Sequence, residues 1–387
     1  MAAVAWLGLS AVALTRAPAP LGWGFALEPE ELAASARALP PLFEDLLDYV
    51  KPAGHAHSPS LFEAEDGTLS ALWFDGSREG ATDVVIGRMV VRGPGGPRIG
   101  PAPESLVSAP QVQAAVRPEQ ALRKLGNSVV AQAPGGPPLL FATTVSFGGW
   151  AMSKIAVMPL GAGLAPGPAA RHLPLSPVMN RSALVRANPI LFADGTIGLP
   201  TYHEQIGRYG ELLRLSPDGR LLAQVRMSHG MGGIQPVVVP LDRLRAVAYL
   251  RNFSGDRTFL LRTRTADGGR TWSPLERTAL ASLNSPAAAA RLSSGAVVVV
   301  YNDGPERRDR LVLAVSTDQG ETFRTIHVLE DGVARPGDAR YPTLIRLRDG
   351  SFALAFSTRS RGGIRVVRFT EAWVAQELAR AGGEARP

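Results

Sequence analysis

The polar residues best suited to act together stand at the heads of six similar segments of the chain. In most of these segments a proline follows the polar residue directly, as in Ser58-Pro59 and Tyr341-Pro342. The heads carry imidazole, hydroxyl, amide and phenol groups, which can bind polar ligands. If the fold brings them together, they line one polar cleft. The six heads are His57/Ser58, Asn127, Asn188, Gln235, Ser285 and Tyr341.

Two further features could contribute to such a cleft. His203-Glu204 ends the third segment and could serve in acid–base chemistry, and a purely structural role explains the pair equally well. Trp150 follows Gly148-Gly149 and could stack on a sugar ring or pack inside the fold. The six histidines are scattered, and none lies four residues from another, so the sequence predicts neither a metal site nor a cofactor.

The elements that would position these residues are β-hairpins, and the clearest of them spans residues 340–357. Apolar and polar residues alternate as far as Leu347, Asp349-Gly350 then forms a tight turn, and an apolar strand returns from Phe352. An Asp-Gly pair between two alternating runs is a strong hairpin signal, because both residues tolerate a positive φ.

The same pattern occurs six times, at intervals of roughly 50 to 70 residues. A single hairpin cannot bury its apolar face, but hairpins arranged as blades around a common axis can. We therefore predict an all-β fold, a six-bladed β-propeller whose head positions point into a central cleft. A β-sandwich with coincidental turns is the alternative. The six copies are residues 58–76, 127–145, 188–204, 235–251, 285–303 and 340–357.

We expect four parts along the chain. Residues 1–27 form an apolar leader, residues 28–52 a short helical extension, residues 53–374 the propeller, and residues 375–387 a C-terminal tail. A short helix is expected over residues 371–380. The apolar run of the leader is short for a membrane span and suits the apolar core of a signal peptide. The positively charged residues that normally precede such a core are missing. Export, or a loose membrane association through this end, is predicted. A cytoplasmic protein with an apolar leader is the alternative.

Composition narrows the classes of partner. The chain carries a formal charge of +7, and all but three of its 41 basic residues are arginine. This balance favours an anionic substrate or surface, or else reflects a genome that encodes arginine in place of lysine. No basic run contains interleaved aromatic residues, so no nucleic-acid partner is expected. The absence of cysteine excludes disulfides and thiolate catalysis. The oligomeric state is not indicated.

Two short motifs identify a family. Residues 265–272 (TADGGRTW) and 316–323 (STDQGETF) share the pattern Ser/Thr-x-Asp-x-Gly-x-Thr-Trp/Phe. We interpret each as a turn between outer strands, in which the Asp binds backbone amides and the Gly takes a positive φ. The pattern is similar to the Asp-box of the sialidase (neuraminidase) superfamily, and residues 54–374 resemble the bacterial sialidase-like BNR-repeat proteins. In that family the Asp-boxes lie away from the active site.

The resemblance implies roles for several residues. Sialidases hold the substrate carboxylate with three arginines, protonate the leaving group with an Asp on a mobile loop, and attack with a Tyr that a Glu activates. A neutral phenol suits this attack, because a carboxylate nucleophile would be repelled by the acidic sugar. Tyr341 resembles the nucleophile. Asp83 resembles the acid/base, or is a loop residue that caps a turn. Arg78, Arg251 and Arg308 resemble the carboxylate clamp, with Arg307 or Arg310 as alternatives to Arg308.

Two positions depart from the family pattern. His57 stands where the first clamp arginine is expected, and Gln235 stands where the Glu that pairs with Tyr341 is expected. A glutamine cannot accept the phenol proton. Either another base serves, or Tyr341 is not a nucleophile. The candidate bases are His57, His203, Glu204 and His229.

Three functions follow from these considerations. The first is a glycoside hydrolase of the exo-α-sialidase type that removes a terminal acidic sugar from a glycan. The second is a non-catalytic propeller that binds glycan or protein. The third is a lyase acting on an acidic polysaccharide, with His57 or His203 as base and Tyr341 as acid. The expected catalytic positions are Asp83, Tyr341, Gln235 and His57, and the expected substrate-binding residues are Arg78, Arg251, Arg308, His203, Glu204, Asn188 and Trp150.

Overall fold

The computed structural model describes residues 21–93, 102–116, 121–176, 180–205, 207–228 and 232–383. Most of the predicted leader, residues 1–20, lies outside the described residues, as does the candidate base His229. None of the helices within the described ranges is long and apolar enough to cross a membrane.

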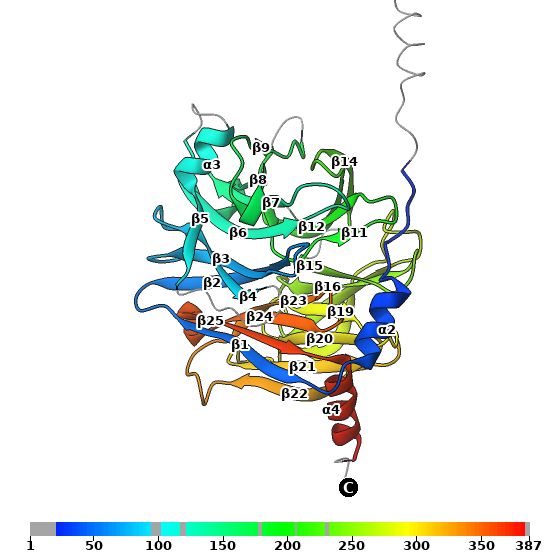
Figure 1. Cartoon of the computed structure of the whole chain (residues 1–387). Coiled ribbons are helices and arrows are strands. Elements are labelled where there is room, and N and C mark those ends of the chain that lie inside the picture. Colours follow the sequence, from blue (N-terminus) through cyan, green and yellow to red (C-terminus); the bar gives the residue numbers. More distant parts are fainter. Residues whose placement is uncertain are drawn as a thin grey trace, which may run out of the picture.

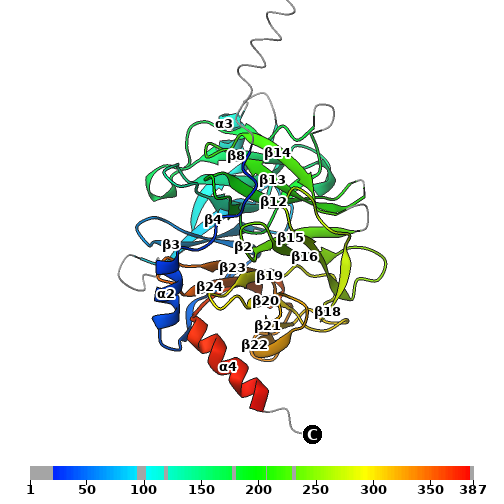
Figure 2. The same ribbon diagram turned by 90° about the vertical axis from the view of Figure 1, so that its right-hand side faces the viewer.

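Over these residues the strands form six antiparallel sheets arranged as a ring of blades, which confirms the predicted six-bladed propeller (Figures 1 and 2). Blade I contains β2 (His55–Glu63), β3 (Leu69–Gly76), β4 (Val85–Arg92) and β5 (Glu104–Ser108). Blade II contains β6 (Lys124–Ala131), β7 (Leu139–Val145), β8 (Lys154–Pro159) and β9 (Arg171–His172). Blade III contains β10 (Ala183–Val185), β11 (Ile190–Leu191), β12 (Ile197–His203), β13 (Tyr209–Leu215) and β14 (Leu221–Arg226).

The remaining three blades follow in chain order. Blade IV contains β15 (Gly233–Pro240), β16 (Ala246–Asn252), β17 (Phe259–Thr265) and β18 (Glu276–Ala281). Blade V contains β19 (Ala288–Arg291), β20 (Val297–Asn302), β21 (Arg310–Ser316) and β22 (Arg324–Asp331). Blade VI contains β23 (Arg340–Arg346), β24 (Phe352–Thr358), β25 (Gly363–Phe369) and the early strand β1 (Phe43–Val50).

Strand β1 corrects one sequence-based expectation. Residues 43–50 were expected within the helical extension, but they pair antiparallel with β25, so the N-terminal part of the chain closes the ring (Figure 1). The open edge of β25 offers backbone hydrogen bonds that outweigh a weak local helix preference. Helix α2 covers only Glu30–Ala38. At the other end, helix α4 (Glu371–Gly383) confirms the short helix expected over residues 371–380 and extends slightly beyond it.

The end of the predicted leader also packs on the propeller. Phe25 stacks on Phe192 of blade III at 5.4 Å between ring centroids, and its backbone bridges to the same residue. The buried guanidinium of Arg214 lies 4.1 Å over the Phe192 ring and 5.0 Å over that of Trp23. Residues 23–25 therefore belong to the folded body.

The core lies between the blades. Six apolar clusters each join two neighbouring blades, and together they follow the ring from blade I to blade VI and back. The cluster that joins blades VI and I contains Leu47 of β1 beside Trp73 of β3. Burial of apolar surface between blades is what holds the ring together.

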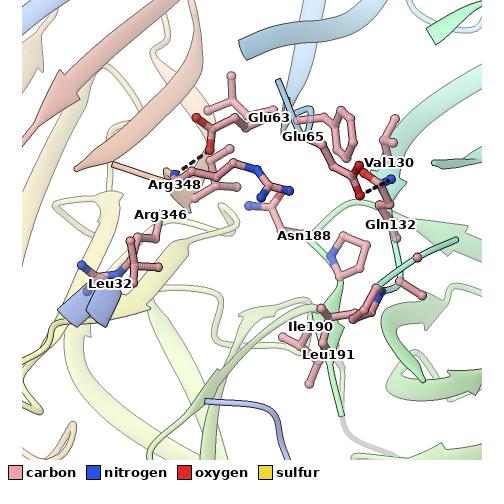
Figure 3. Close-up of a pocket in the computed structure, with 18 residues that line it drawn as sticks. Leu32, Glu63, Glu65, Val130, Gln132, Asn188, Ile190, Leu191, Arg346 and Arg348 are labelled. Carbon is pink, nitrogen blue, oxygen red and sulfur yellow. Dashed lines mark hydrogen bonds between the residues drawn. The ribbon is translucent and has the colours of Figure 1, made fainter. Parts of the chain in front are cut away.

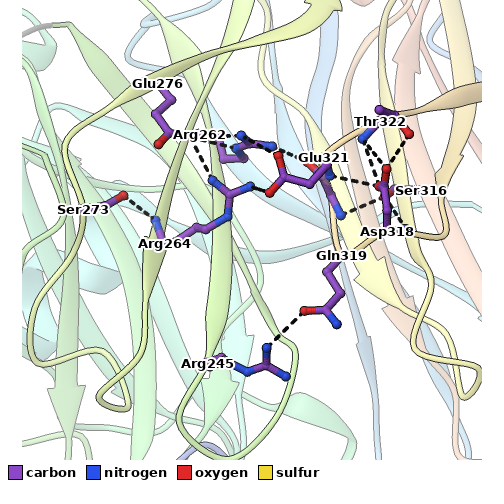
Figure 4. A network of polar contacts seen from close by, with 11 residues as sticks. Arg245, Arg262, Arg264, Ser273, Glu276, Ser316, Asp318, Gln319, Glu321 and Thr322 are labelled. Carbon is purple, nitrogen blue, oxygen red and sulfur yellow. Dashed lines mark hydrogen bonds and ion pairs between the residues drawn. The ribbon is translucent and has the colours of Figure 1, made fainter.

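Both predicted Asp-box turns are present, between β17 and β18 and between β21 and β22, and Figure 4 shows the second. In the second, the carboxylate of Asp318 accepts hydrogen bonds from the Thr322 amide (2.9 Å) and the Ser316 hydroxyl (2.6 Å), and Gly320 has a φ of +90°. A shortened version occurs between β13 and β14, where the Ser216 hydroxyl binds Asp218 and accepts the Arg220 amide at 2.9 Å.

The two Asp-box hairpins are also tied to each other. Arg262 of β17 donates to the Gly320 carbonyl at 2.5 Å and pairs with Glu321 at 3.1 Å (Figure 4). Arg264 pairs with both Glu276 and Glu321. This network joins blades IV and V on their outer side, away from the central axis.

Candidate active site

The inner strands of four blades share an irregularity at the same level. The register shifts at the heads of β2, β6, β15 and β23. At three of these bulges the residue before the proline takes a positive φ, namely 55° at Ser58, 54° at Gln235 and 60° at Tyr341. Such a conformation costs about 1–3 kcal/mol for a residue other than glycine. A bulge re-aims side chains, and here it brings the heads of the strands to the axis.

These heads surround one small central pocket with a volume of about 50 Å³. Typical small-molecule sites enclose about 300–1,000 Å³, so the pocket in this conformation has room for water but not for a sugar. Two of the six heads, Asn188 and Ser285, do not line it. The Ser285 hydroxyl is bound to Asn302 within blade V at 2.6 Å. The lining residues are His57, Glu79, Asn127, Thr143, Trp150, Leu184, Tyr202, Glu204, Gln235, Arg251 and Tyr341.

Tyr341 lies among cations and rings in this pocket. Its hydroxyl accepts a hydrogen bond from Arg251 Nη1 at 3.3 Å. The Arg186 guanidinium lies 5.4 Å from the centre of its ring, and the His57 ring meets it edge-on at 4.5 Å. Arg251 is held in turn by Asn284, which accepts from Nε at 2.7 Å. The predicted nucleophile and one predicted clamp arginine are therefore in contact.

Gln235 positions its neighbours and offers no proton acceptor of carboxylate strength. Its amide oxygen accepts from Arg251 Nη1 at 3.3 Å, and its amide nitrogen donates to the Tyr202 hydroxyl at 3.2 Å. Burial raises the pKa of Tyr202 far above that of a free tyrosine. Tyr202 therefore stays protonated as a neutral wall of the pocket.

His57 does not replace the missing arginine as a cation. Its side chain is 1% exposed, and its Nδ1 forms a hydrogen bond with the Ser357 hydroxyl at 2.9 Å. Burial, with the nearby charges of Arg361 and Arg340, holds the pKa of His57 well below its ordinary value, so the ring is neutral. Its buried Nε2 has no partner within the described residues.

The His203-Glu204 pair divides between two faces of β12. Tyr202 and Glu204 line the pocket, whereas His203 stacks on Tyr209 with 4.9 Å between ring centroids. This division follows from the pleat, because successive side chains on a strand point to opposite faces. Burial raises the pKa of Glu204, against the opposing effects of Arg251 and Arg208. Its carboxylate has no hydrogen-bond or ion-pair partner in the described part of the chain.

The loop after β3 places a different carboxylate in the pocket from the one expected. Glu79 lines the pocket and pairs with Arg361 at 2.6 Å. Asp83 instead binds the amide and hydroxyl of Ser77, both at 3.0 Å, and lies exposed in a separate depression beside Lys51. The Ser77 hydroxyl holds the pKa of Asp83 below its ordinary value. Asp83 is the turn-capping residue, a role the sequence left open.

Two of the three arginines expected at the clamp, Arg78 and Arg308, lie outside the pocket lining. Arg78 is exposed. Arg308 donates through Nε to the Leu283 carbonyl at 3.1 Å. The two alternatives to Arg308 are occupied elsewhere, since Arg307 pairs with Asp309 at 2.6 Å and Arg310 pairs with Asp303 at 3.1 Å.

Trp150 forms one side of the pocket and begins the short helical turn η1 (Trp150–Met152). Its ring lies against the backbone of Gly126, where an added Cβ would come within 2.8 Å of Trp150 Cζ3. Gly126 stands in the β6 bulge, so a glycine there allows the ring to reach the pocket. No group of three His, Cys, Asp or Glu side chains able to hold a metal ion occurs within the described ranges.

A family model, the BNR repeat-like domain, matches residues 67–354, which is most of the propeller. The chain belongs to the BNR repeat-like family. No curated protein sequence matches this BNR repeat-like chain.

Solved structures of the same fold are distant in sequence. A protein of unknown function from Dyadobacter fermentans is 16% identical, with a TM-score of 0.65 over 85% of this chain and 99% of its own. A Hadza microbial sialidase is 14% identical, with a TM-score of 0.65 over 84% of this chain and 68% of its own. The Trypanosoma rangeli sialidase is 12% identical, with a TM-score of 0.60 over 88% of this chain and 62% of its own. At these identities the likeness shows a sialidase-type propeller fold.

In this BNR repeat-like propeller the central channel is blocked below the pocket. Arg186, which is 4% exposed, donates to the carbonyls of Pro342 at 2.5 Å and Ala287 at 3.4 Å. Asn188 reaches across to the Leu344 carbonyl at 2.8 Å and accepts from the Thr343 hydroxyl at 2.9 Å. Two side chains of blade III thus bridge to blades V and VI.

Asn188 consequently lies outside the central pocket. From the sequence we expected it inside that pocket. It lines a second cavity of about 680 Å³ at the opposite ends of the inner strands (Figure 3). That cavity is bordered by Leu32 of α2 and by Glu63, whose carboxylate accepts the Arg348 amide at 2.7 Å.

Proposed function

We propose that this chain is a sialidase-like glycoside hydrolase of the exo-α-sialidase type, which removes a terminal acidic sugar from a glycan. The observation that carries the proposal is the Tyr341 phenol in the central pocket, 3.3 Å from Arg251, with two carboxylates lining the same pocket. Nucleophile, cation and proton-transfer groups are the parts that retaining hydrolysis of an acidic glycoside needs.

The residues divide the reaction as follows. The phenol oxygen of Tyr341 attacks the anomeric carbon while its proton passes to Glu204, the pocket carboxylate without a partner in the described residues. Glu79 donates a proton to the departing glycosidic oxygen, and the bond to the rest of the glycan breaks. Water, deprotonated by Glu79, then cleaves the tyrosyl–sugar bond, and Tyr341 regains its proton from Glu204. Arg251 binds the sugar carboxylate beside the phenol.

The test is turnover of fluorogenic glycosides of acidic sugars, including a sialoside. The wild-type protein should release the fluorophore, and Tyr341→Phe should reduce kcat/KM by at least about 10³-fold, because the nucleophile is lost. Tyr209→Phe, at the start of β13 and outside the pocket lining, is the matched control and should retain activity. Equal activity of wild type and Tyr341→Phe would refute Tyr341 as nucleophile.

A non-catalytic glycan- or protein-binding propeller is the second candidate. Gln235 and the neutral His57 favour it, because both stand where the resemblance leads us to expect charged catalytic or binding groups. Glycan binding without turnover across the panel would support this reading. An unsaturated product that absorbs near-ultraviolet light would instead identify a lyase.

We also propose that the protein is exported, on the strength of the apolar run in residues 2–14. Fractionation of cells that express the full chain checks this. A signal in the exported or membrane fraction agrees with the proposal, and a purely cytoplasmic signal contradicts it.

A further inference from the structure

One ion pair joins two blades at the rim of the central pocket. Glu79 comes from the loop between β3 and β4 of blade I, and Arg361 comes from η3 (Arg359–Arg361), in the hairpin between β24 and β25 of blade VI. Their side chains meet at 2.6 Å, and each is about a third exposed, at 31% and 29%. Glu79 lines the pocket directly, so the pair lies at its edge.

The hairpin that carries Arg361 is held in an unfavourable conformation. Three successive residues, Arg359, Ser360 and Arg361, have φ values of 52°, 52° and 85°. Each of these costs free energy for a residue other than glycine, and such runs persist where the surroundings impose them. The neighbouring Arg359 turns the other way and pairs with Asp48 of β1 at 2.9 Å. The hairpin therefore directs one arginine outward and one toward the pocket.

Arg361 pairs with Glu79, whereas the nearby Arg340 pairs with Asp338 at 3.2 Å. Arg361 and Arg340 both act on the buried His57 as positive charges, and Arg308 adds to the field at Arg340. An arginine–carboxylate contact is favourable and directional, but a partly exposed pair contributes little to stability. A ligand carboxylate can therefore replace the Glu79 carboxylate at Arg361 without a large penalty.

The size of the pocket points the same way. A cavity of about 50 Å³ cannot hold a sugar, so ligand binding requires that a rim group move. Among the described residues, Glu79 is held by the Arg361 pair and by its amide, which donates to His55 at 3.1 Å. Its side chain can therefore move without disturbing a blade core.

We propose that the Glu79–Arg361 ion pair is an exchangeable latch that makes the pocket selective for ligands with a carboxylate. In the structure Glu79 pairs with Arg361. The carboxylate of an acidic sugar binds Arg361 in its place, alongside Arg251, and the rim opens. The released Glu79 carboxylate takes up a proton from solvent and then donates it to the glycosidic oxygen. This inference rests on the proposed function for its ligand class. It assigns the role of specificity-determining residue to Arg361, because the neutral His57, at the position of the expected clamp arginine, cannot bind a carboxylate as a cation.

The test is binding of N-acetylneuraminic acid and of its methyl ester, measured by calorimetry, which requires no turnover. Glu79→Gln removes the internal competitor, so affinity for the acid should rise by about two- to fivefold while affinity for the ester stays unchanged. Arg361→Gln should lower the affinity for the acid by about tenfold or more and leave the affinity for the ester unchanged. Arg361→Lys should restore part of the lost affinity. Arg359→Gln is the matched control from the same hairpin, and it should bind both ligands as the wild type does.

The outcomes separate this inference from the hydrolase proposal. If Glu79→Gln lowers the affinity for the acid or leaves it unchanged, the latch is refuted, even where the wild type hydrolyses sialosides. If the wild type binds neither acid nor ester, the latch is also refuted. If the acid binds with the expected pattern but no variant or wild type turns over any glycoside, the latch stands and the hydrolase proposal fails. Should Arg361→Gln fail to fold, Glu79→Gln and the acid–ester comparison still decide.

Discussion

At the scale of single residues, the direction in which a side chain points decides whether it can take part in the reaction. Glu79 and Asp83 stand four positions apart in one loop, yet one lines the pocket while the other caps Ser77. Glu204 and His203 are neighbours, and only Glu204 reaches the pocket. In both cases the carboxylate inside lines the pocket, and the group outside has a structural contact of its own, Asp83 with Ser77 and His203 with Tyr209.

The first prediction compares the two loop carboxylates. Glu79→Gln should lower kcat for a glycoside with a poor leaving group by about 10²- to 10⁴-fold, since a general acid contributes that much. Asp83→Asn should keep kcat within a few-fold, because its carboxylate binds Ser77 and not substrate. Steady-state kinetics of the two variants decide. Loss in Asp83→Asn with retention in Glu79→Gln would reverse the assignment.

The second prediction concerns pH. Burial raises the pKa of Glu204, and a base acts only in its unprotonated form. The value of kcat/KM should therefore rise with pH through a midpoint above that of a free glutamate, and Glu204→Gln should remove this limb. His203→Gln is the control from the other face of β12, and its profile should match the wild type. An unchanged acidic limb in Glu204→Gln would exclude Glu204 as the base.

At the scale of elements, the bulged inner strands and the crossing side chains of blade III make the site. The bulges at the heads of β15 and β23 bring Gln235 and Tyr341 to the axis. Arg186 lies beneath them, where its guanidinium faces the Tyr341 ring and binds carbonyls of two other blades. Burial lowers the pKa of Arg186 to about 10, which still leaves it charged at neutral pH.

The third prediction follows from that contact. Arg186→Leu leaves the buried carbonyls of Pro342 and Ala287 without donors, and we expect a loss of about 1–3 kcal/mol in the free energy of unfolding. Arg348→Leu, at an exposed position bordering the second cavity, should change stability by no more than about 0.5 kcal/mol. Denaturant titration measures both. Equal stabilities would mean that the bridge contributes nothing net.

At the scale of the whole molecule, an early strand completes the last blade. Strand β1 supplies the outer edge of blade VI, and Arg365 of β25 anchors it to Asp45 at 2.6 Å. Leu47 enters the cluster between blades VI and I. Strands from both ends of the chain thus close the ring, and β1 covers the edge that β25 would otherwise expose.

The fourth prediction tests this closure within one strand. Leu47 is 6% exposed, and Leu47→Ala should cost about 2–4 kcal/mol of stability through lost burial and a cavity. Val50, at the end of β1, is 50% exposed, so Val50→Ala should change stability by less than about 0.5 kcal/mol. Thermal unfolding followed by circular dichroism compares them. A small effect in both would show that β1 adds little to the closed ring.

The sequence by itself determined the repeat, because each hairpin depends on features of neighbouring residues. These features are the alternation of apolar and polar residues, a turn-forming pair, and in most copies a polar residue before a proline. From that repeat the six-bladed ring follows, and the Asp-box turns follow from their own side chains. Six of the residues singled out from the sequence line one pocket of the structure, namely His57, Trp150, Glu204, Gln235, Arg251 and Tyr341.

Only the tertiary structure decided the rest, since it depends on contacts between residues far apart in the chain. Strand β1 is a strand because the edge of β25, more than three hundred residues later, offers it hydrogen bonds. Glu79 enters the pocket, and Asp83 does not, because Arg361 of another blade lies within its reach. Asn188 lines the second cavity and not the central pocket, because its side chain binds the Leu344 carbonyl of blade VI. No local pattern encodes such partners.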